Sequence, residues 1–185
     1  GPDAPTYSLE GTVNGAGAAL AWAEEHWGIG PIAPQLDDWL ARPGEPPILV
    51  NTIGGLGSPW WRAGPDARLV GDGEPWQRGV AVAESIVFLI QANLDCLADA
   101  GVAPARLRVS GGLARADGLC RRLADLSGLA VSRPAATEAT ARGIAWLAAG
   151  QPSDWPRPPE DSFTPSANPA LGDRYRRFCA LLAAG

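Results

Sequence analysis

The stretch 107–134 most constrains the fold, because it predicts a strand, a helix and a second strand in quick succession. The run "LRVS" stops at Gly111-Gly112, an amphipathic helix follows as far as Gly128, and "LAVSRP" predicts a short second strand. A helix of this length between two strands predicts a crossover connection, which makes the two strands parallel. Since strands and helices alternate along the chain, we expect an α/β fold with a largely parallel sheet covered on both faces.

Hydrophobic periodicity and chain-breaking residues predict the other elements. Residues 76–100 carry apolar side chains at spacings of three and four and form the longest predicted helix. We expect Gly28 to end one helix, and Thr137 to cap the start of another. The remaining predictions are the end of a strand at 6–11, helices at 12–27, 34–42 and 138–150, a strand at 48–53, an irregular loop at 54–75, a Pro-rich strap from 151, and a last amphipathic helix.

Composition excludes several classes of site. The 185 residues contain no Lys, which excludes a Walker-type phosphate loop and Schiff-base chemistry. One His and three scattered Cys make a zinc site implausible, so we expect no metal held by protein ligands alone. The net charge of −5 argues against a nucleic-acid partner, and no apolar run predicts a membrane span. The cysteines lie on apolar helix faces, which predicts buried thiols and suits a reducing cytoplasm.

Glycines crowd two predicted helix starts. Gly111-Gly112 lies between a predicted strand and a predicted helix. The second group lies before or within the start of the helix at 12–27 and consists of Gly11, Gly15 and Gly17. Glycine permits positive φ and removes Cβ, so each group has two explanations. Either the chain packs or turns tightly there, or a ligand lies directly on the main chain.

Other polar and aromatic residues have a structural interpretation beside a functional one. For Asp66 and Asp72 we favour solvated or loop-capping roles over acid–base chemistry. Trp60 and Trp61 either fill a gap between loop and core or stack on a ligand. For the arginines a solvated helix face is favoured over phosphate binding, and they are Arg115, Arg121 and Arg122.

Several segments together resemble the C-terminal lobe of the FGGY carbohydrate kinases. They occur in family order and are "YSLEGTVNGAGAALAW", "GGLGSPWWRAGPDARLVG", "WQRGVAVAESIVFLIQANLDCL", "LRVSGGLARADGLCRRLADLSGLAVSRP" and "EATARGIAWLAAG". The "GLGSPWW" loop is more similar to the glycerol kinase branch than to the xylulose kinase branch. The resemblance implies an RNase H-like, actin-like ATPase lobe with a mixed, largely parallel sheet flanked by helices.

The resemblance also implies an activity and its partners. ATP, with Mg²⁺ bound through the nucleotide phosphates, would lie mainly on this lobe. An N-terminal kinase lobe would supply the catalytic aspartate and the sugar or polyol site, so we expect no catalytic residue in this chain. Homo-oligomerisation stays open, and the sequence does not specify the sugar or polyol.

Six residues carry the expected nucleotide site. By resemblance, Gly112 passes under the nucleoside with Gly111 beside it, and Gly17 lies near the phosphates. Two polar contacts of the family are replaced by alanine.

Ala116 stands where glycerol kinases often have an Asn that contacts the base. Asp117 follows it and is a candidate to substitute for that Asn, although a carboxylate lacks the amide donor. Ala21 stands in place of a Gln. These replacements put nucleotide affinity, or the choice of phosphoryl donor, in question.

The match covers the lobe from a late point onward. We expect residues 1–150 to form the nucleotide-binding lobe, incomplete at the Gly-Thr-rich hairpin that the family places first, and 151–185 to pack on it. On this view 7–9 is a strand without its usual neighbour, and the chain is a fragment that is inactive alone. The alternative is a degenerate actin-like domain kept as a regulatory or interaction module.

Overall fold

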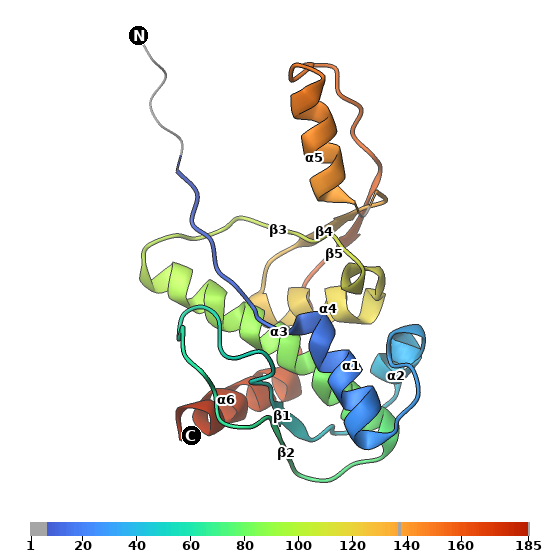
Figure 1. The fold of residues 1–185 in the computed structure, drawn as a ribbon, viewed down its shortest axis with the longest axis vertical. Coiled ribbons are helices and arrows are strands. Elements are labelled where there is room, and N and C mark those ends of the chain that lie inside the picture. Colours follow the sequence, from blue (N-terminus) through green and yellow to red (C-terminus); the bar gives the residue numbers. More distant parts are fainter. Residues whose placement is uncertain (1–6, 137, 185) are drawn as a thin grey trace.

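The computed structural model describes residues 7–136 and 138–184 and combines helices with two small sheets (Figure 1). Thr137, predicted as a helix cap, lies outside the described residues. The elements are α1 (Ala16–Trp27), η1 (Ala33–Gln35), α2 (Leu36–Ala41), β1 (Ile48–Val50), β2 (Arg68–Val70), α3 (Pro75–Asp99), β3 (Leu107–Arg108), η2 (Leu113–Arg115), α4 (Asp117–Ser127), β4 (Val131–Pro134), α5 (Ala139–Ala148), β5 (Glu160–Phe163) and α6 (Pro169–Ala183).

The strand pairings confirm the predicted crossover and show a mixed sheet. β3 and β4 pair in parallel, with α4 between them, and β5 adds to the other edge of β4 in antiparallel orientation. β1 and β2 form a separate antiparallel pair. Both β2 and β5 lie in segments predicted to be irregular. β5 is missed because its sequence, Glu-Asp-Ser-Phe, is polar at three of four positions and shows no alternating pattern.

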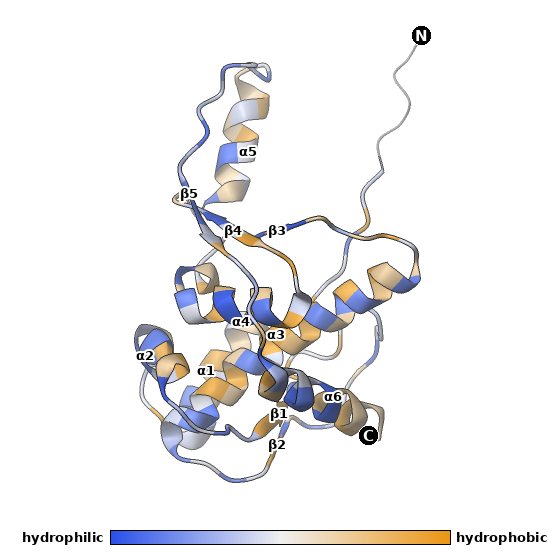
Figure 2. Ribbon diagram, turned by 180° about the vertical axis from the view of Figure 1, so that it is seen from behind, coloured by the Kyte–Doolittle hydropathy of each residue, from blue (hydrophilic) through white to orange (hydrophobic). Residues whose placement is uncertain are grey.

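α3 is the central helix. It begins at Pro75 with a reciprocal capping box between Glu74 and Gln77, which satisfies two backbone N–H groups of its first turn. Its residues from Gly79 to Leu89 are all buried, and hydrophobic residues recur along the helix (Figure 2). Among residues 7–136 and 138–184 it is the one helix long and apolar enough to cross a membrane, yet 61% of that apolar window is buried inside the protein.

Two hydrophobic clusters pack on different sides of α3. The first joins α1, α2 and α4 to its N-terminal half through residues such as Leu20, Trp39 and Leu123. The second joins β1 and α6 to it, and Phe88 of α3 packs there on Phe178 of α6 at a ring-centroid distance of 5.3 Å. The last helix therefore packs on β1 and α3.

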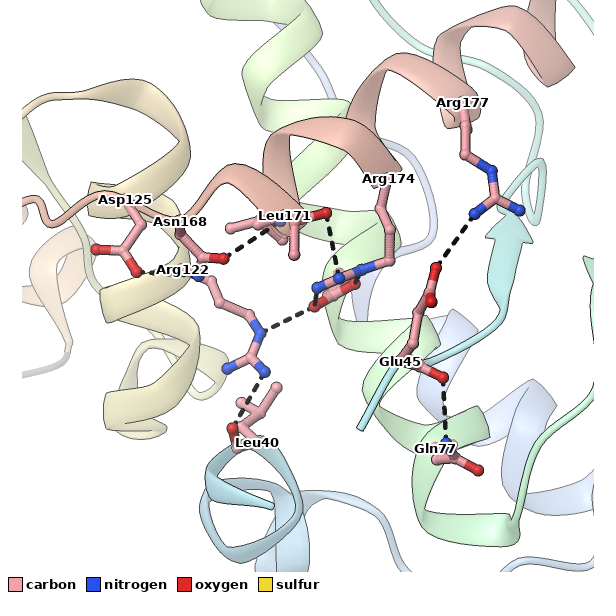
Figure 3. Close-up of polar contacts among 11 residues, drawn as sticks. Leu40, Glu45, Gln77, Arg122, Asp125, Asn168, Leu171, Arg174 and Arg177 are labelled. Atoms are coloured by element: carbon pink, nitrogen blue, oxygen red, sulfur yellow. Dashed lines mark hydrogen bonds and ion pairs between the residues drawn. The ribbon is translucent and has the colours of Figure 1, made fainter. Parts of the chain in front are cut away.

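A buried carboxylate ties three helices together. Glu84 of α3 is 1% exposed, and Arg174 of α6 donates from Nε to its Oε2 at 2.7 Å and from Nη2 to its Oε1 at 2.6 Å. Arg122 of α4 donates from Nε to Oε1 at 3.0 Å, and its Nη2 donates to the carbonyl of Leu40 in α2 (Figure 3). The prediction of a solvated Arg122 is therefore wrong, because its guanidinium neutralises a charge on another helix.

Two further predictions are wrong. Residues 7–13 form no strand, and Tyr7 and Leu9 are 87% and 67% exposed, so the interpretation of 7–9 as a strand without its neighbour does not hold. Cys96 is exposed rather than buried, because it lies near the end of α3, where the helix leaves the core.

The ion cluster gives a stability prediction. Arg174→Ala leaves the Glu84 carboxylate buried with a single partner, and we expect it to lower the free energy of unfolding by about 3–5 kcal/mol. Urea denaturation followed by circular dichroism measures the change. The control is Arg177→Ala on the same helix, whose pair with Glu45 is 58% and 72% exposed, and we expect less than about 1 kcal/mol there. Equal losses at both positions would show that burial of the cluster adds nothing.

Candidate functional site

Two of the glycines before α1 have structural reasons. A Cβ on Gly11 would lie 2.4 Å from Oδ1 of Asn93, and a Cβ on Gly15 would lie 2.3 Å from the carbonyl oxygen of Ile53. Gly15 also has a φ of 66°, the left-handed conformation that favours glycine. Close packing and backbone conformation therefore account for both residues.

Gly17 has no such reason. It lies in the first turn of α1, it is exposed, and a Cβ there would meet nothing within 4 Å. The N-cap Gly15 makes no side-chain cap hydrogen bond and no acidic residue lies in the first turn of α1, so no cap of this kind satisfies its first N–H groups. Ala21 lies one turn further along and is also exposed.

The backbone explains one of the two glycines at 111 and 112 but not the other. Gly111 has a φ of 97°, so the turn itself requires glycine there. Gly112 has helical angles, φ −59° and ψ −45°, it is exposed, and a Cβ there would meet nothing within 4 Å. Tight packing against the strand therefore does not explain Gly112.

The start of α4 lies directly after this turn. Ala116 is half-buried and packs against the first hydrophobic cluster. The side chain of Asp117 is 50% exposed, and its Oδ1 lies 2.9 Å from Nη2 of Arg133. The carboxylate predicted to substitute for an amide at the base is thus also one half of an ion pair, which fixes its position.

Arg133 and Cys120 have shifted pKa values. Hydrogen bonding to Asp161 is the main cause that raises the pKa of the Arg133 guanidinium, so this side chain stays charged. Burial raises the pKa of the Cys120 thiol, whose Sγ donates to the carbonyl of Ala114. The cysteine nearest the glycine turn is therefore protonated and is no nucleophile.

The two helix starts rest on one hydrophobic cluster. Ala19 and Leu20 of α1 belong to it, as does Leu119 of α4, and Leu113 and Ala116 pack against it. The sequence identified these glycine positions, but it gave no signal for Arg133. That residue lies in a short strand, and its partners are distant in sequence.

The aromatic loop residues have different surroundings. Trp60 is half-buried and packs on the second hydrophobic cluster, which agrees with the gap-filling interpretation. Trp61 is 66% exposed with a φ of 47°. His26 at the end of α1 stacks on Trp22 at a ring-centroid distance of 4.6 Å.

A protein-family model settles the relationship. The C-terminal domain of the FGGY family of carbohydrate kinases matches residues 1–151. The chain belongs to the FGGY family. The resemblance found in the sequence is thereby confirmed.

Curated relatives agree with this assignment. Glycerol kinase from Xanthobacter autotrophicus is 37% identical over 187 residues, which is 92% of this chain and 37% of the relative. Glycerol kinase from Allorhizobium ampelinum is 36% identical over 166 residues, which is 82% of this chain and 32% of the relative. The chain thus spans about a third of the length of the curated relatives it matches.

Solved structures confirm the fold. Glycerol kinase from Plasmodium falciparum, solved with ADP, has a TM-score of 0.74 at 19% identity and covers 91% of this chain and 36% of its own. Xylulose kinase from Rhodospirillum rubrum has a TM-score of 0.72 at 25% identity and covers 91% and 38%. The α/β lobe of the actin-like ATPase type, with a mixed sheet flanked by helices, is the observed fold.

The two kinds of glycine give a prediction for stability. We expect Gly112→Ala to leave the free energy of unfolding unchanged or to raise it by up to about 1 kcal/mol, because the backbone is helical and the space is open. Gly15→Ala should lower it by more than about 1 kcal/mol, because a carbonyl oxygen occupies the Cβ position. Urea denaturation of the two variants checks both. A destabilised Gly112→Ala would mean that packing explains the glycine after all.

Proposed function

We propose that this chain is the ATP-binding part of an ATP-dependent polyol or sugar kinase of the glycerol kinase type. The observation that carries the proposal is the open main chain at Gly17 and Gly112. At these two exposed positions neither backbone conformation nor packing requires glycine, whereas a ligand lying flat on the chain does.

The nucleotide would use the two helix starts in different ways. The adenosine lies over Gly112, with Gly111 turning the chain beneath it. The uncapped N–H groups at the start of α1, beside Gly17, attract the phosphates, because a helix N-terminus carries partial positive charge. Mg²⁺ would be held through the phosphate oxygens and would offset their charge. The ADP in the Plasmodium relative supports nucleotide binding on this fold.

Two alanines weaken this site. Ala21 and Ala116 stand where the family resemblance predicts a Gln and an Asn. Each lost hydrogen bond costs about 1 kcal/mol, or roughly a fivefold loss of affinity. The same two residues favour the second candidate, a degenerate domain kept as a regulatory or interaction module. Asp117 keeps an acceptor near the base, which supports the kinase.

The proposal assigns catalysis to an N-terminal lobe. The family resemblance implies no catalytic residue on this chain, so the chain alone is expected to be inactive. The exposure of α5 supports a contact with such a lobe. None of the described residues of α5 is buried, and Ile144 and Leu147 are 63% and 56% exposed. α5 projects away from the other helices (Figures 1 and 2).

Nucleotide titration tests the proposal. Calorimetry or NMR of the purified chain with ATP and Mg²⁺ should show saturable binding at millimolar nucleotide or below. We expect Gly112→Val to raise the Kd by at least about tenfold, because its methyl groups occupy the space of the nucleoside.

The matched control is Gly30→Val. A Cβ on Gly30 also meets nothing within 4 Å, but Gly30 lies beyond the far end of α1, so its Kd should match that of the unaltered chain. Absence of binding by the folded chain would favour the interaction module. Equal Kd values for Gly112→Val and the unaltered chain would show that the nucleotide binds elsewhere.

A further inference from the structure

One arginine, Arg133, is hydrogen-bonded to the segment that follows the glycine turn. Arg133 of β4 donates from Nη1 to the carbonyls of Ala114 and Arg115 at 2.9 and 3.0 Å. Its Nη2 lies 2.9 Å from Oδ1 of Asp117 and 2.6 Å from Oδ2 of Asp161. A single guanidinium thus connects η2, the first residue of α4 and the strand β5.

The polar groups of the segment after the turn depend on this arginine. Gly111 and Gly112 have no side chains, and the space over them is open. η2 ends after one turn, so the carbonyls of Ala114 and Arg115 receive no continuing helical ladder. Ala114 is buried, so loss of the arginine would leave its carbonyl with only the weak Sγ donor of Cys120.

The arginine is itself well fixed. Its side chain is 14% exposed, and its guanidinium carbon lies 5.3 Å from the ring centre of Phe163 in β5. Asp161, two residues earlier on β5, also accepts from Nε at 3.2 Å. The planar fork of arginine can serve two carbonyls and two carboxylates together, which the ammonium of lysine cannot.

We propose that Arg133 is a positioning residue for the nucleotide, and this inference rests on the proposed function. Arg133 acts through the turn: it sets the backbone of the segment after Gly112 and orients the Asp117 carboxylate. The strap strand β5 contributes through Asp161. Nucleotide affinity thereby depends on a strand outside the segment matched by the family model.

Three substitutions test the role of Arg133. Arg133→Met keeps an apolar side chain of similar length but removes all five polar contacts to the four partner residues, and we expect an ATP–Mg²⁺ Kd about tenfold higher. Arg133→Lys keeps the charge but loses the fork, so its Kd should lie between that of Arg133→Met and that of the unaltered chain. The control is Arg108→Met on the neighbouring strand β3, whose partner Glu160 also lies on β5 and which does not touch the turn. Its Kd should stay unchanged.

A second readout separates positioning from general stability. In the nucleotide-free chain, ¹H–¹⁵N NMR should show shifted amide signals for Gly111, Gly112 and Gly118 in Arg133→Met, and unshifted ones in Arg108→Met. If Arg133→Met does not fold, Asp161→Asn removes one anchor only and should give the same shifts in smaller measure with a smaller rise in Kd.

The outcomes separate this inference from the proposed function. If the unaltered chain binds ATP and folded Arg133→Met binds it equally well, the positioning role is overturned while the nucleotide site stands. If the unaltered chain binds no nucleotide, the proposed function fails. In that case the NMR spectra decide what Arg133 does. If the glycine amide signals of Arg133→Met are unshifted, Arg133 does not position the turn either. If they are shifted, Arg133 shapes the turn but has no role in nucleotide binding.

Discussion

The arrangement of helices depends on one buried charge. Glu84 lies in the middle of α3 with both carboxylate oxygens occupied, by Arg174 from α6 and Arg122 from α4. Burying a carboxylate is unfavourable unless its partners are in place, so the charge favours the relative position of α3, α4 and α6 in which both arginines reach it. Since the glycine turn leads through η2 into α4, the ion cluster also helps to fix where the candidate site stands relative to the core.

The candidate site combines an open upper surface with a firmly held base. Above Gly112 and Gly17 there is no side chain within contact distance. Below the turn, Arg133 satisfies the carbonyls that a single 3₁₀ turn leaves free. A flat ligand gains most from such a surface when the backbone is already in the bound conformation, because binding then costs little ordering. The arginine and the glycines therefore contribute to the same candidate site, although they belong to different elements.

The features that the sequence predicted correctly depend on residues that are close together along the chain. The periodicity from Val80 to Leu97 gave α3 nearly to the residue, and the left-handed glycine at 128 ended α4 where expected. The glycine positions of the candidate site were also visible. The ion partners were not, because Glu84 lies 38 residues from Arg122 and 90 from Arg174. β5 was missed for a related reason, since a polar edge strand is stabilised by its neighbour rather than by its own pattern.

Gly17 bears on the choice between a kinase lobe and a degenerate module. A glycine in a helix costs up to about 1 kcal/mol relative to alanine, and at Gly17 no packing gain offsets that cost. The same helix carries alanine at position 21, where the family resemblance predicts a polar contact. A helix start with no use for open main chain would be more stable with alanine at 17 as well. The physical balance at this position therefore favours a ligand that still lies against the backbone.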